Sequence, residues 1–501
     1  MLAIYKRELK SYFRSFIGFL FIAVTLFFLG LYFSVYNLMN GYPYFAYVVS
    51  SVTFLFMLTV PILTMRILAE EKRSKTDQLI LTAPVSVGGI VMGKFLALLT
   101  IFAIPVAIIC FYPLIMAQYG SVPMGEAYLS ILAYFLFGMT AIAIGLFLSS
   151  VTESQVIAAV LTFLVLFLGY MMDSICSIIS STGNLLTKLL RCFDLYTPFS
   201  NLLNGTLDVS SIVYYVSVTA LVLFLTVQSI QKRRYSMSVK NLSFSAYSTG
   251  MIAVAVALVV VVNIIMGEMP SSWTAIDMTS QKLYSLTDQT VDYVKNMQDD
   301  VTIYVLVNQD NQDTTLGQTL QRYDDLSDHI TVEYVDPTVN PMFYTQYTTG
   351  NISTNSLIVV SDKRSKVIDY NDVYESSYDF DYSTYSYNTT TTGYDGEGQI
   401  TSALDYVLND DMPKVYMTTG HNELSLSNTF TSALNKENVD YETVNLMDLD
   451  AIPDDAACLF INGATSDFSS DDKDKVIDYL NNGGKAVSYT HLRAHETSLH
   501  L

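Results

Sequence analysis

The chain has 501 residues, of which 51% are hydrophobic and only 15% charged, and this balance excludes an ordinary soluble protein. Its formal net charge is −20, yet 15 of the 27 basic side chains and only nine of the 47 acidic ones lie at or before Met266. The first part is therefore basic and the second strongly acidic. The acidic surface argues against nucleic acid as a partner, and the two parts are expected in different environments.

Residues 1–15 form the first predicted element. Leu2, Tyr5, Leu9 and Phe13 recur at helical spacing among basic side chains. This pattern indicates an interfacial amphipathic helix on the inner leaflet. A cytoplasmic extension of the first membrane span fits the pattern equally well.

Seven apolar stretches are long enough to cross about 30 Å of hydrocarbon. Six of them form a polytopic α-helical domain over residues 16–235, and after a cytoplasmic linker at 236–248 the seventh serves as an anchor at 249–266. Basic residues in the connections number 13 on one side and two on the other, which places the N-terminus in the cytoplasm and the acidic part outside. We place the spans at Phe16–Tyr36, Phe45–Met65, Phe95–Met116, Tyr128–Leu148, Val156–Met172, Ser211–Ile230 and Thr249–Met266.

These seven spans contain no Asp, Glu, Lys, Arg or His as placed. Ion-coupled carriers and proton pumps use such side chains at membrane depth to bind and release the coupling ion. The class is therefore disfavoured, and energy for any transport is expected to enter from outside the spans.

The loop between the second and third spans is the candidate site on the cytoplasmic side. Arg66 and Glu70 are four residues apart, so a helix that continues out of the second span would pair them, with Glu71 and Lys72 next in sequence. Pro84 then ends the following helical segment. A short helix at the membrane surface can receive a push from a soluble partner. The alternative is a solvated connector with paired charges.

The sequence of this loop resembles that of the permease subunits of ABC-2-type transporters, particularly the GldF-like group. The resemblance extends over about residues 1–235. The resemblance implies that the chain forms the membrane path, docks a separate ATP-binding subunit and pairs with a second permease copy. On this reading Arg66, Glu70, Glu71, Lys72 and Pro84 belong to the coupling surface, and ATP and magnesium are bound by the partner. The segment that carries the resemblance reads PILTMRILAEEKRSKTDQLILTAPVSVGGIVMGKF.

A second motif in the same loop imitates a nucleotide site. Residues 88–94 fit the first seven positions of a phosphate-binding loop, but Phe95 follows where a Ser or Thr must reach magnesium. The motif also leads into a membrane span instead of following a buried strand. We therefore expect this chain to be no enzyme and to hold no cofactor.

The acidic part alternates short apolar runs with helical patterns, which predicts an α/β extracytoplasmic domain with a mainly parallel sheet. Its first part is placed at 267–410 and its second at 411–487. Residues 344–398, rich in Tyr, Ser, Thr, Asn and Asp, are expected to form a low-complexity insertion.

This part resembles the extracytoplasmic domain of GldG-like auxiliary subunits over about residues 246–487. The resemblance implies an auxiliary domain that contacts an unknown extracytoplasmic substrate or partner. Residues 488–501 resemble a translated sequencing adapter, which implies a non-native tail and a truncated domain. The matching segments read IDMTSQKLYSLTDQT, VTIYVLV, QITSALDYV, KVYMTTGHNE, PDDAACLFINGA and VIDYLNNGGKAV.

His421 and Glu423 follow a predicted strand, where open α/β sheets place a ligand crevice. They are a candidate outer-domain site, although a capping or turn role fits as well, because no nucleophile accompanies them. The spacing of the cysteines and acidic residues matches no metal motif.

The sequence thus favours the permease component of an ABC transporter, fused to an extracytoplasmic auxiliary domain, in the cytoplasmic membrane. The alternative is a non-transporting, membrane-anchored envelope protein that binds a partner or senses a signal.

Overall fold

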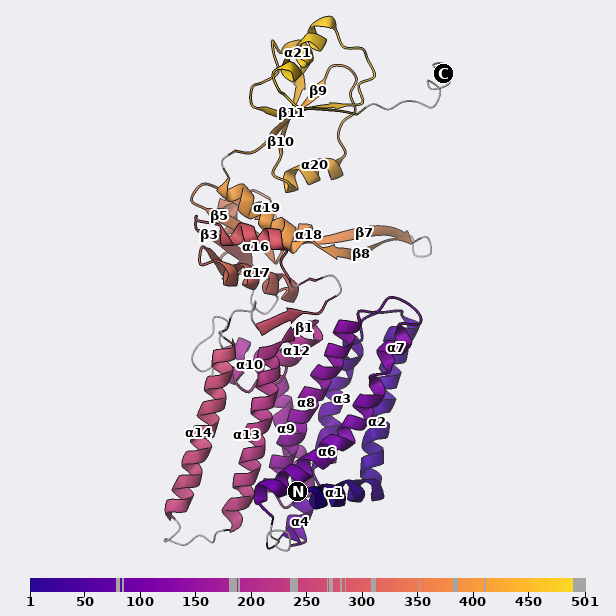
Figure 1. The fold of residues 1–501 in the computed structure, drawn as a ribbon, viewed down its shortest axis with the longest axis vertical. Helices are drawn as coiled ribbons and strands as arrows, with labels where there is room; N and C mark the ends of the chain where they lie inside the picture. The colour runs from indigo at the N-terminus through magenta and orange to yellow at the C-terminus, as the bar shows by residue number, and fades with distance from the viewer. Residues whose placement is uncertain are drawn as a thin grey trace. The chain divides into compact units, whose positions relative to one another are not determined.

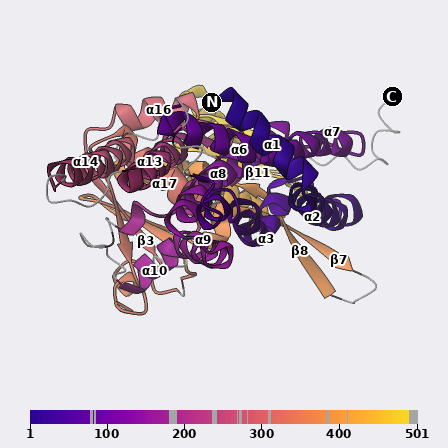
Figure 2. The same ribbon diagram turned by 90° about the horizontal axis from the view of Figure 1, so that it is seen from below.

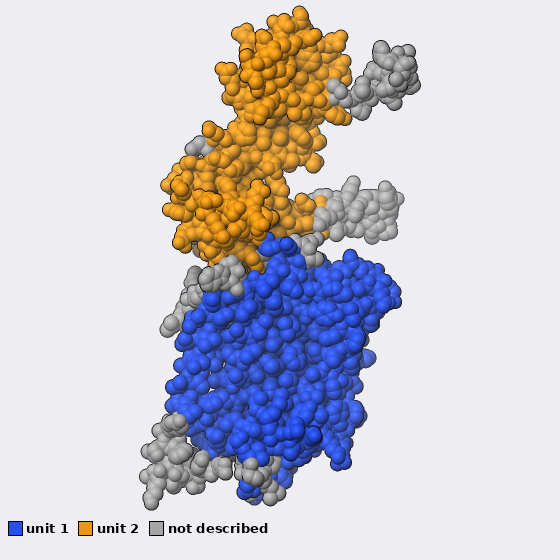
Figure 3. Space-filling view, viewed as in Figure 1, with its two compact units in different colours: residues 1–285 blue, residues 286–501 orange. Residues whose placement is uncertain are grey.

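The computed structural model describes residues 1–77, 82, 85–179, 187, 190–234, 242–267, 269, 274–279, 282–283, 285–307, 312–350, 352–381, 386–409 and 411–489. The chain folds as two compact units, Met1–Ser285 and Leu286–Leu501 (Figure 3). We call them the membrane unit and the outer unit. The expected turn at Pro84 and tail residues 490–501 lie outside the described residues.

Within the described residues of the membrane unit, six helices are long and apolar enough to cross a membrane. The pair α9 and α10, bent by 56° at its break, gives a seventh if it is counted as one span. The long elements are α2 (Phe16–Phe33), continued by the π-helix η1 (Ser34–Met39), α3 (Ala46–Thr64), α6 (Val87–Ile109), α8 (Met124–Val151), α9 (Gln155–Tyr170), α10 (Met172–Ile179), α13 (Val209–Arg234) and α14 (Leu242–Gly267). The short helices are α1 (Leu2–Arg14), α4 (Ala69–Arg73), α7 (Tyr112–Met116) and α12 (Thr197–Leu203).

The third span differs from its prediction in a way that matters for the site. Helix α6 begins at Val87, two turns before the expected Phe95, because the Ser86 hydroxyl caps it by accepting from the amide of Gly89 at 3.1 Å. Lys94 therefore lies inside the helix and is fully buried. The prediction that no span contains an ionisable residue is wrong at this position. The segment 88–94 is helical, so it forms no phosphate-binding loop.

Helix α8 is the central element of the membrane unit. In its most apolar window 72% of the residues are buried, the largest share among the candidate spans, and it packs against α3, α6, α9 and α13. Seen from below, α8 lies among these helices, whereas α14 lies at the edge beside α13 (Figure 2). Gly138 of α8 permits a close approach to α6, since a Cβ at this position would lie 2.4 Å from the ring of Phe102.

A small sheet closes the end of the membrane unit opposite α1 (Figure 1). Strand β1 (Thr206–Asp208) pairs antiparallel with β2 (Ala275–Asp277), which follows α14. Residues 274–279 therefore belong with the membrane unit, and the α/β part begins at Leu286 instead of residue 267.

The outer unit contains two four-stranded sheets. The first has the order β4-β3-β5-β6, with β3 (Val301–Leu306) parallel to β4 (Ile330–Val335) but antiparallel to β5 (Ser356–Ser361), and with β6 (Ser365–Ile368) antiparallel to β5. This first sheet is therefore mixed, with parallel and antiparallel pairs. Its helices are α16 (Asp288–Lys295), α17 (Thr314–Leu326), α18 (Tyr370–Val373) and α19 (Gly396–Leu408), with the 3₁₀ turn η4 (Tyr344–Gln346).

The expected insertion at 344–398 is narrower than predicted. Strands β5 and β6 lie within this range, and Leu357 and Val359 belong to the core of the first sheet. Within the polar remainder, β7 (Tyr374–Asp381) and β8 (Ser386–Tyr394) form a two-stranded ribbon.

The second sheet is parallel throughout, as predicted for this part. Its order is β10-β9-β11-β12, formed by β9 (Lys414–Thr419), β10 (Asp440–Asn445), β11 (Ala456–Asn462) and β12 (Ala486–Tyr489). Helices α20 (Asn428–Lys436) and α21 (Ser470–Asn481) and the turn η5 (Leu446–Asp448) accompany it. Strand β12 includes Ser488 and Tyr489, the first two residues assigned to the tail.

Candidate functional site

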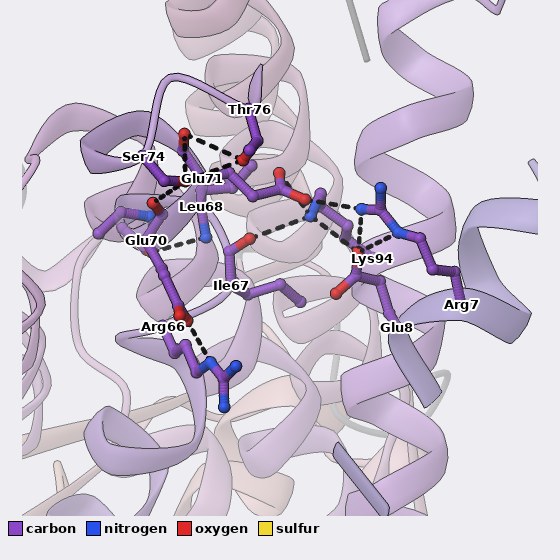
Figure 4. Close-up of polar contacts among 12 residues, drawn as sticks. Arg7, Glu8, Arg66, Ile67, Leu68, Glu70, Glu71, Ser74, Thr76 and Lys94 are labelled. Carbon is purple, nitrogen blue, oxygen red and sulfur yellow. Dashed lines mark hydrogen bonds and ion pairs between the residues drawn. The ribbon is translucent and has the colours of Figure 1, made fainter. Parts of the chain in front are cut away.

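A buried lysine links three segments at the α1 end of the membrane unit. The Lys94 ammonium, at 0% exposure, lies 2.8 Å from Glu71 Oε2 and 3.1 Å from Glu8 Oε1. It also donates to the backbone carbonyl of Ile67 at 3.0 Å. Figure 4 shows these contacts converging from α1, α6 and the α3–α4 turn. Two hydrogen bonds, to Glu8 and Ile67, and the ion pair with Glu71 thus surround the buried ammonium.

Arg7 completes the cluster, which we call the Lys94 cluster. Its guanidinium donates to Glu71 Oε1 at 2.6 Å and pairs with Glu8. Burial alone would lower the pKa of Arg7, but the two carboxylates outweigh it and raise this pKa above its usual value. The cluster therefore balances two cations against two carboxylates. Removing one member would leave an unpaired charge in a desolvated place.

Helix α1 turns an unexpected face inward. Glu8 and Tyr12 are buried against the membrane unit, whereas Leu2 is 62% exposed. The Tyr12 hydroxyl donates to the carbonyl of Leu63 at 2.9 Å. Gly93 lets α1 approach α6, since a Cβ at Gly93 would lie 3.0 Å from the carbonyl of Met1. The predicted helix is confirmed, but its inner face is held by polar contacts as well as apolar ones.

The predicted coupling loop forms α4, a five-residue helix reached through a turn at 65–68. The expected pair of Arg66 with Glu70 is present. Both side chains are partly exposed to solvent, which screens their charges, so this pair contributes little to stability. Glu71 instead points to Lys94. Lys72 donates to the carbonyl of Val151 at the end of α8 at 2.9 Å.

Ser149 fixes the turn to α8. Its hydroxyl accepts from the amides of Leu68 and Ala69 at 3.2 and 3.1 Å and donates to the carbonyl of Met65 at 3.2 Å. The first free amides of α4 are therefore satisfied by another helix rather than by a local cap. The loop is thus anchored on α6 through Lys94 and on α8 through Ser149.

Among the described residues the exposed surface of this end is mainly cationic, with Glu153 as an exposed carboxylate. Lys6, Lys10, Arg14, Arg73 and Lys75 are exposed there, whereas the acidic Glu8 and Glu71 face inward. Two features of the sequence could have indicated this arrangement: Glu8 is the lone acidic residue in a basic helix, and Lys94 lies next to an apolar stretch. Sequence reasoning missed Glu8, Lys94 and Ser149.

The second predicted site lies in the outer unit. His421 and Glu423 are brought together at the carboxyl end of β9, and Asp472 of α21 joins them. The ring nitrogens of His421 lie 3.5 Å from Glu423 Oε1 and 3.3 Å from Asp472 Oδ2. The ring also stacks on Phe468, with 4.1 Å between centroids. We call these four residues the His421 cluster.

The His421 cluster is closed to solvent. The side chains of His421, Glu423 and Asp472 are 2%, 3% and 1% exposed. The pKa of Asp472 is lowered, because the Ser469 hydroxyl and the charge of Lys475 outweigh burial. No substrate reaches His421 in this conformation, and the cluster ties the loop after β9 to the start of α21. The outer-domain site at His421 and Glu423 stays a prediction.

The helical bundle, with a short surface helix fixed across it, defines a multi-pass membrane protein. Residues 31–265 match the family model described as ABC-2 family transporter protein. The N-terminal region is therefore similar to this family, which supports an ABC-2 permease domain and a membrane component of an ABC transporter. The match includes α14, beyond the expected limit near residue 235.

Two further comparisons concern the outer unit and the whole chain. Residues 280–373 match a family model described as a domain of unknown function (DUF7088). This match covers all four strands of the mixed sheet and ends before the β7–β8 ribbon. A search of curated proteins gives no significant match.

Proposed function

We propose that this chain is the permease subunit of an ATP-binding cassette transporter, and that a separate ATPase subunit docks on α4 and α1. ATP and magnesium belong to that partner. The family match of residues 31–265 supports the transporter class. The observation that carries the docking site is the double anchorage of α4, on α6 through Lys94 and on α8 through Ser149.

The anchorage suits a helix that receives force. A push on a loosely attached loop is lost in local motion. A push on α4 instead reaches α6 through the ion pair of Glu71 with Lys94, and α8 through the backbone contacts of Ser149. Because the Lys94 cluster also holds α1, the two short helices present one docking surface with exposed Arg73 and Lys10.

The proposal includes the setting of the complex. The excess of basic residues at the α1 end supports a cytoplasmic N-terminus and an extracytoplasmic outer unit. A second copy of the permease is expected to complete the membrane path. The outer unit would act as a GldG-like auxiliary domain that contacts a substrate or partner outside the cytoplasm.

The proposal predicts that an ATP-binding cassette protein is encoded beside this chain, and co-purification with that protein tests the docking site. The full chain in lipid nanodiscs is expected to bind this ATPase and to change its rate of hydrolysis. Arg73→Glu, which reverses an exposed charge on α4, should weaken binding about tenfold or more, as loss of a central contact does at many interfaces. Lys282→Glu, an exposed charge reversal near β2, is the matched control and should bind normally.

Two outcomes contradict the proposal. Equal binding by the Arg73→Glu and Lys282→Glu variants would remove α4 from the interface. A chain that purifies alone and leaves ATP hydrolysis unchanged would favour the alternative, an envelope protein that binds or senses without transport.

A further inference from the structure

We infer that α8, joined to α13, transmits the position of the α3–α4 turn to β2, the strand that precedes the outer unit. This inference concerns the membrane unit alone and does not require an ATPase partner. It rests on contacts at the two ends of α8 and on hydroxyl contacts between α8 and α13.

One end of α8 is bonded to the α3–α4 turn. Ser149 contacts three backbone groups of the turn and Lys72 donates to the carbonyl of Val151, the last residue of α8. One turn earlier, Gly145 abuts α3 so closely that a Cβ would lie 2.2 Å from Thr64 Oγ1. The turn therefore cannot shift without moving this end of α8 or breaking several contacts at once.

The other end of α8 abuts the β2 strand region. A Cβ at Gly125 would lie 2.7 Å from the carbonyl of Met278, a backbone atom that cannot give way. The amide of Met278 donates to the carbonyl of Gly205 at 2.9 Å, and Gly205 precedes β1. Gly205 has φ +88°, a conformation that favours glycine. A movement of the first turn of α8 would therefore displace the backbone directly after β2.

Helix α13 stiffens the connection and ends at the same place. Thr140 of α8 and Thr219 of α13 share a hydrogen bond at 2.9 Å, and Ser150 donates to Ser229 at 3.2 Å. Helix α13 begins at Val209, directly after β1, so both helices meet the β1–β2 pair. The distance from Ser149 to Gly125 along α8 is about 36 Å, at about 1.5 Å per residue. Two joined helices of this length can carry a displacement that a free loop cannot.

Hydrogen exchange of the full chain in nanodiscs tests the inference. Ser149→Ala removes the contacts at the turn and should raise exchange of the amides in residues 275–279 about threefold or more, a change typical of coupling between distant sites. Thr162→Val is the matched control. Thr162 is a buried hydroxyl that bonds the carbonyl of Ala158 within α9, and its loss should leave residues 275–279 unchanged.

The reverse experiment protects against a misfolded variant. Coupling is reciprocal, so Gly125→Ala, which pushes on Met278, should raise exchange of the Leu68 and Ala69 amides by a similar factor. Exchange that changes only beside each substitution overturns the inference. So does a Thr162→Val variant that alters residues 275–279 as strongly as Ser149→Ala.

Discussion

Two charge clusters with buried centres stand out among the described residues, and they are built in opposite ways. The Lys94 cluster gathers residues from α1, α4 and α6 and balances two cations against two carboxylates within hydrogen-bond distance. The His421 cluster places one histidine between two carboxylates, and both ring nitrogens lack hydrogen-bond geometry. The Lys94 cluster joins distant parts of the chain, whereas the His421 cluster closes a loop onto its neighbouring helix.

This difference indicates where each cluster can change. Close pairing fixes Lys94 in one arrangement, because moving it away from Glu8 and Glu71 would leave its buried charge alone. Pairing in the His421 cluster is incomplete, so a substitution there removes fewer stabilising contacts. We therefore expect substitutions at the first cluster to have the larger effects.

The largest effect is expected for Lys94→Met. The substitution leaves Arg7 as the one cation of the cluster beside the two carboxylates of Glu8 and Glu71. Loss of one partner from a buried ion pair lowers stability by about 3–5 kcal/mol. Hydrogen exchange of α1 and α6 amides in the full chain measures this loss. Arg191→Met, which breaks the half-exposed pair with Asp173, is the control and should cost about 1 kcal/mol or less.

A second substitution sharpens this result. Adding Glu8→Gln to Lys94→Met leaves one cation, Arg7, opposite one carboxylate, Glu71. The double variant should therefore lose about 1–3 kcal/mol less stability than the two single variants lose together. Additive losses would mean that the cluster is not one unit.

A smaller effect is expected for His421→Ala. It removes the ring stacked on Phe468 and leaves Glu423 and Asp472 without their shared neighbour, which should cost about 1–3 kcal/mol. Exchange of the β9 and α21 amides provides the measurement. His329→Ala serves as the control, since its pair with Asp300 is exposed, and it should have little effect. If His421→Ala cost as much as Lys94→Met, the contrast between the clusters would fail.

The smallest effect concerns pH. Because the pKa of Asp472 is lowered, its contribution is fully present above the unfolded value of about 3.9 and is lost as pH falls through the folded pKa. Protection of the first turn of α21 should therefore fall below about pH 4. Ser469→Ala removes the main cause of the lowered pKa and should flatten this pH dependence, whatever its effect at neutral pH.

Local features of both regions could be predicted from the sequence. The pair of Arg66 with Glu70 follows from helical spacing, and the parallel second sheet follows from alternating strands and helices. The first sheet is mixed for a physical reason. Between β4 and β5 the described chain forms the short turn η4 but no α-helix, and a parallel return usually runs through a helix that packs on the sheet.

The contacts between distant residues could not be predicted. Lys94 and Glu8 are 86 residues apart, and hydropathy alone placed Lys94 outside the third span. Asp472 joins His421 only because the start of α21 meets the loop after β9, a tertiary contact that no spacing rule reports. The sequence indicated Glu71 in the first cluster and His421 with Glu423 in the second, and folding supplied the other members.

The β1–β2 pair has a practical consequence for dissecting the chain. A fragment cut at residue 267 would carry β2 without the partner strand that satisfies its backbone, and an unpaired strand edge invites aggregation. A fragment that starts at Leu286 begins where the compact outer unit begins and leaves β2 with the partner to which it is paired.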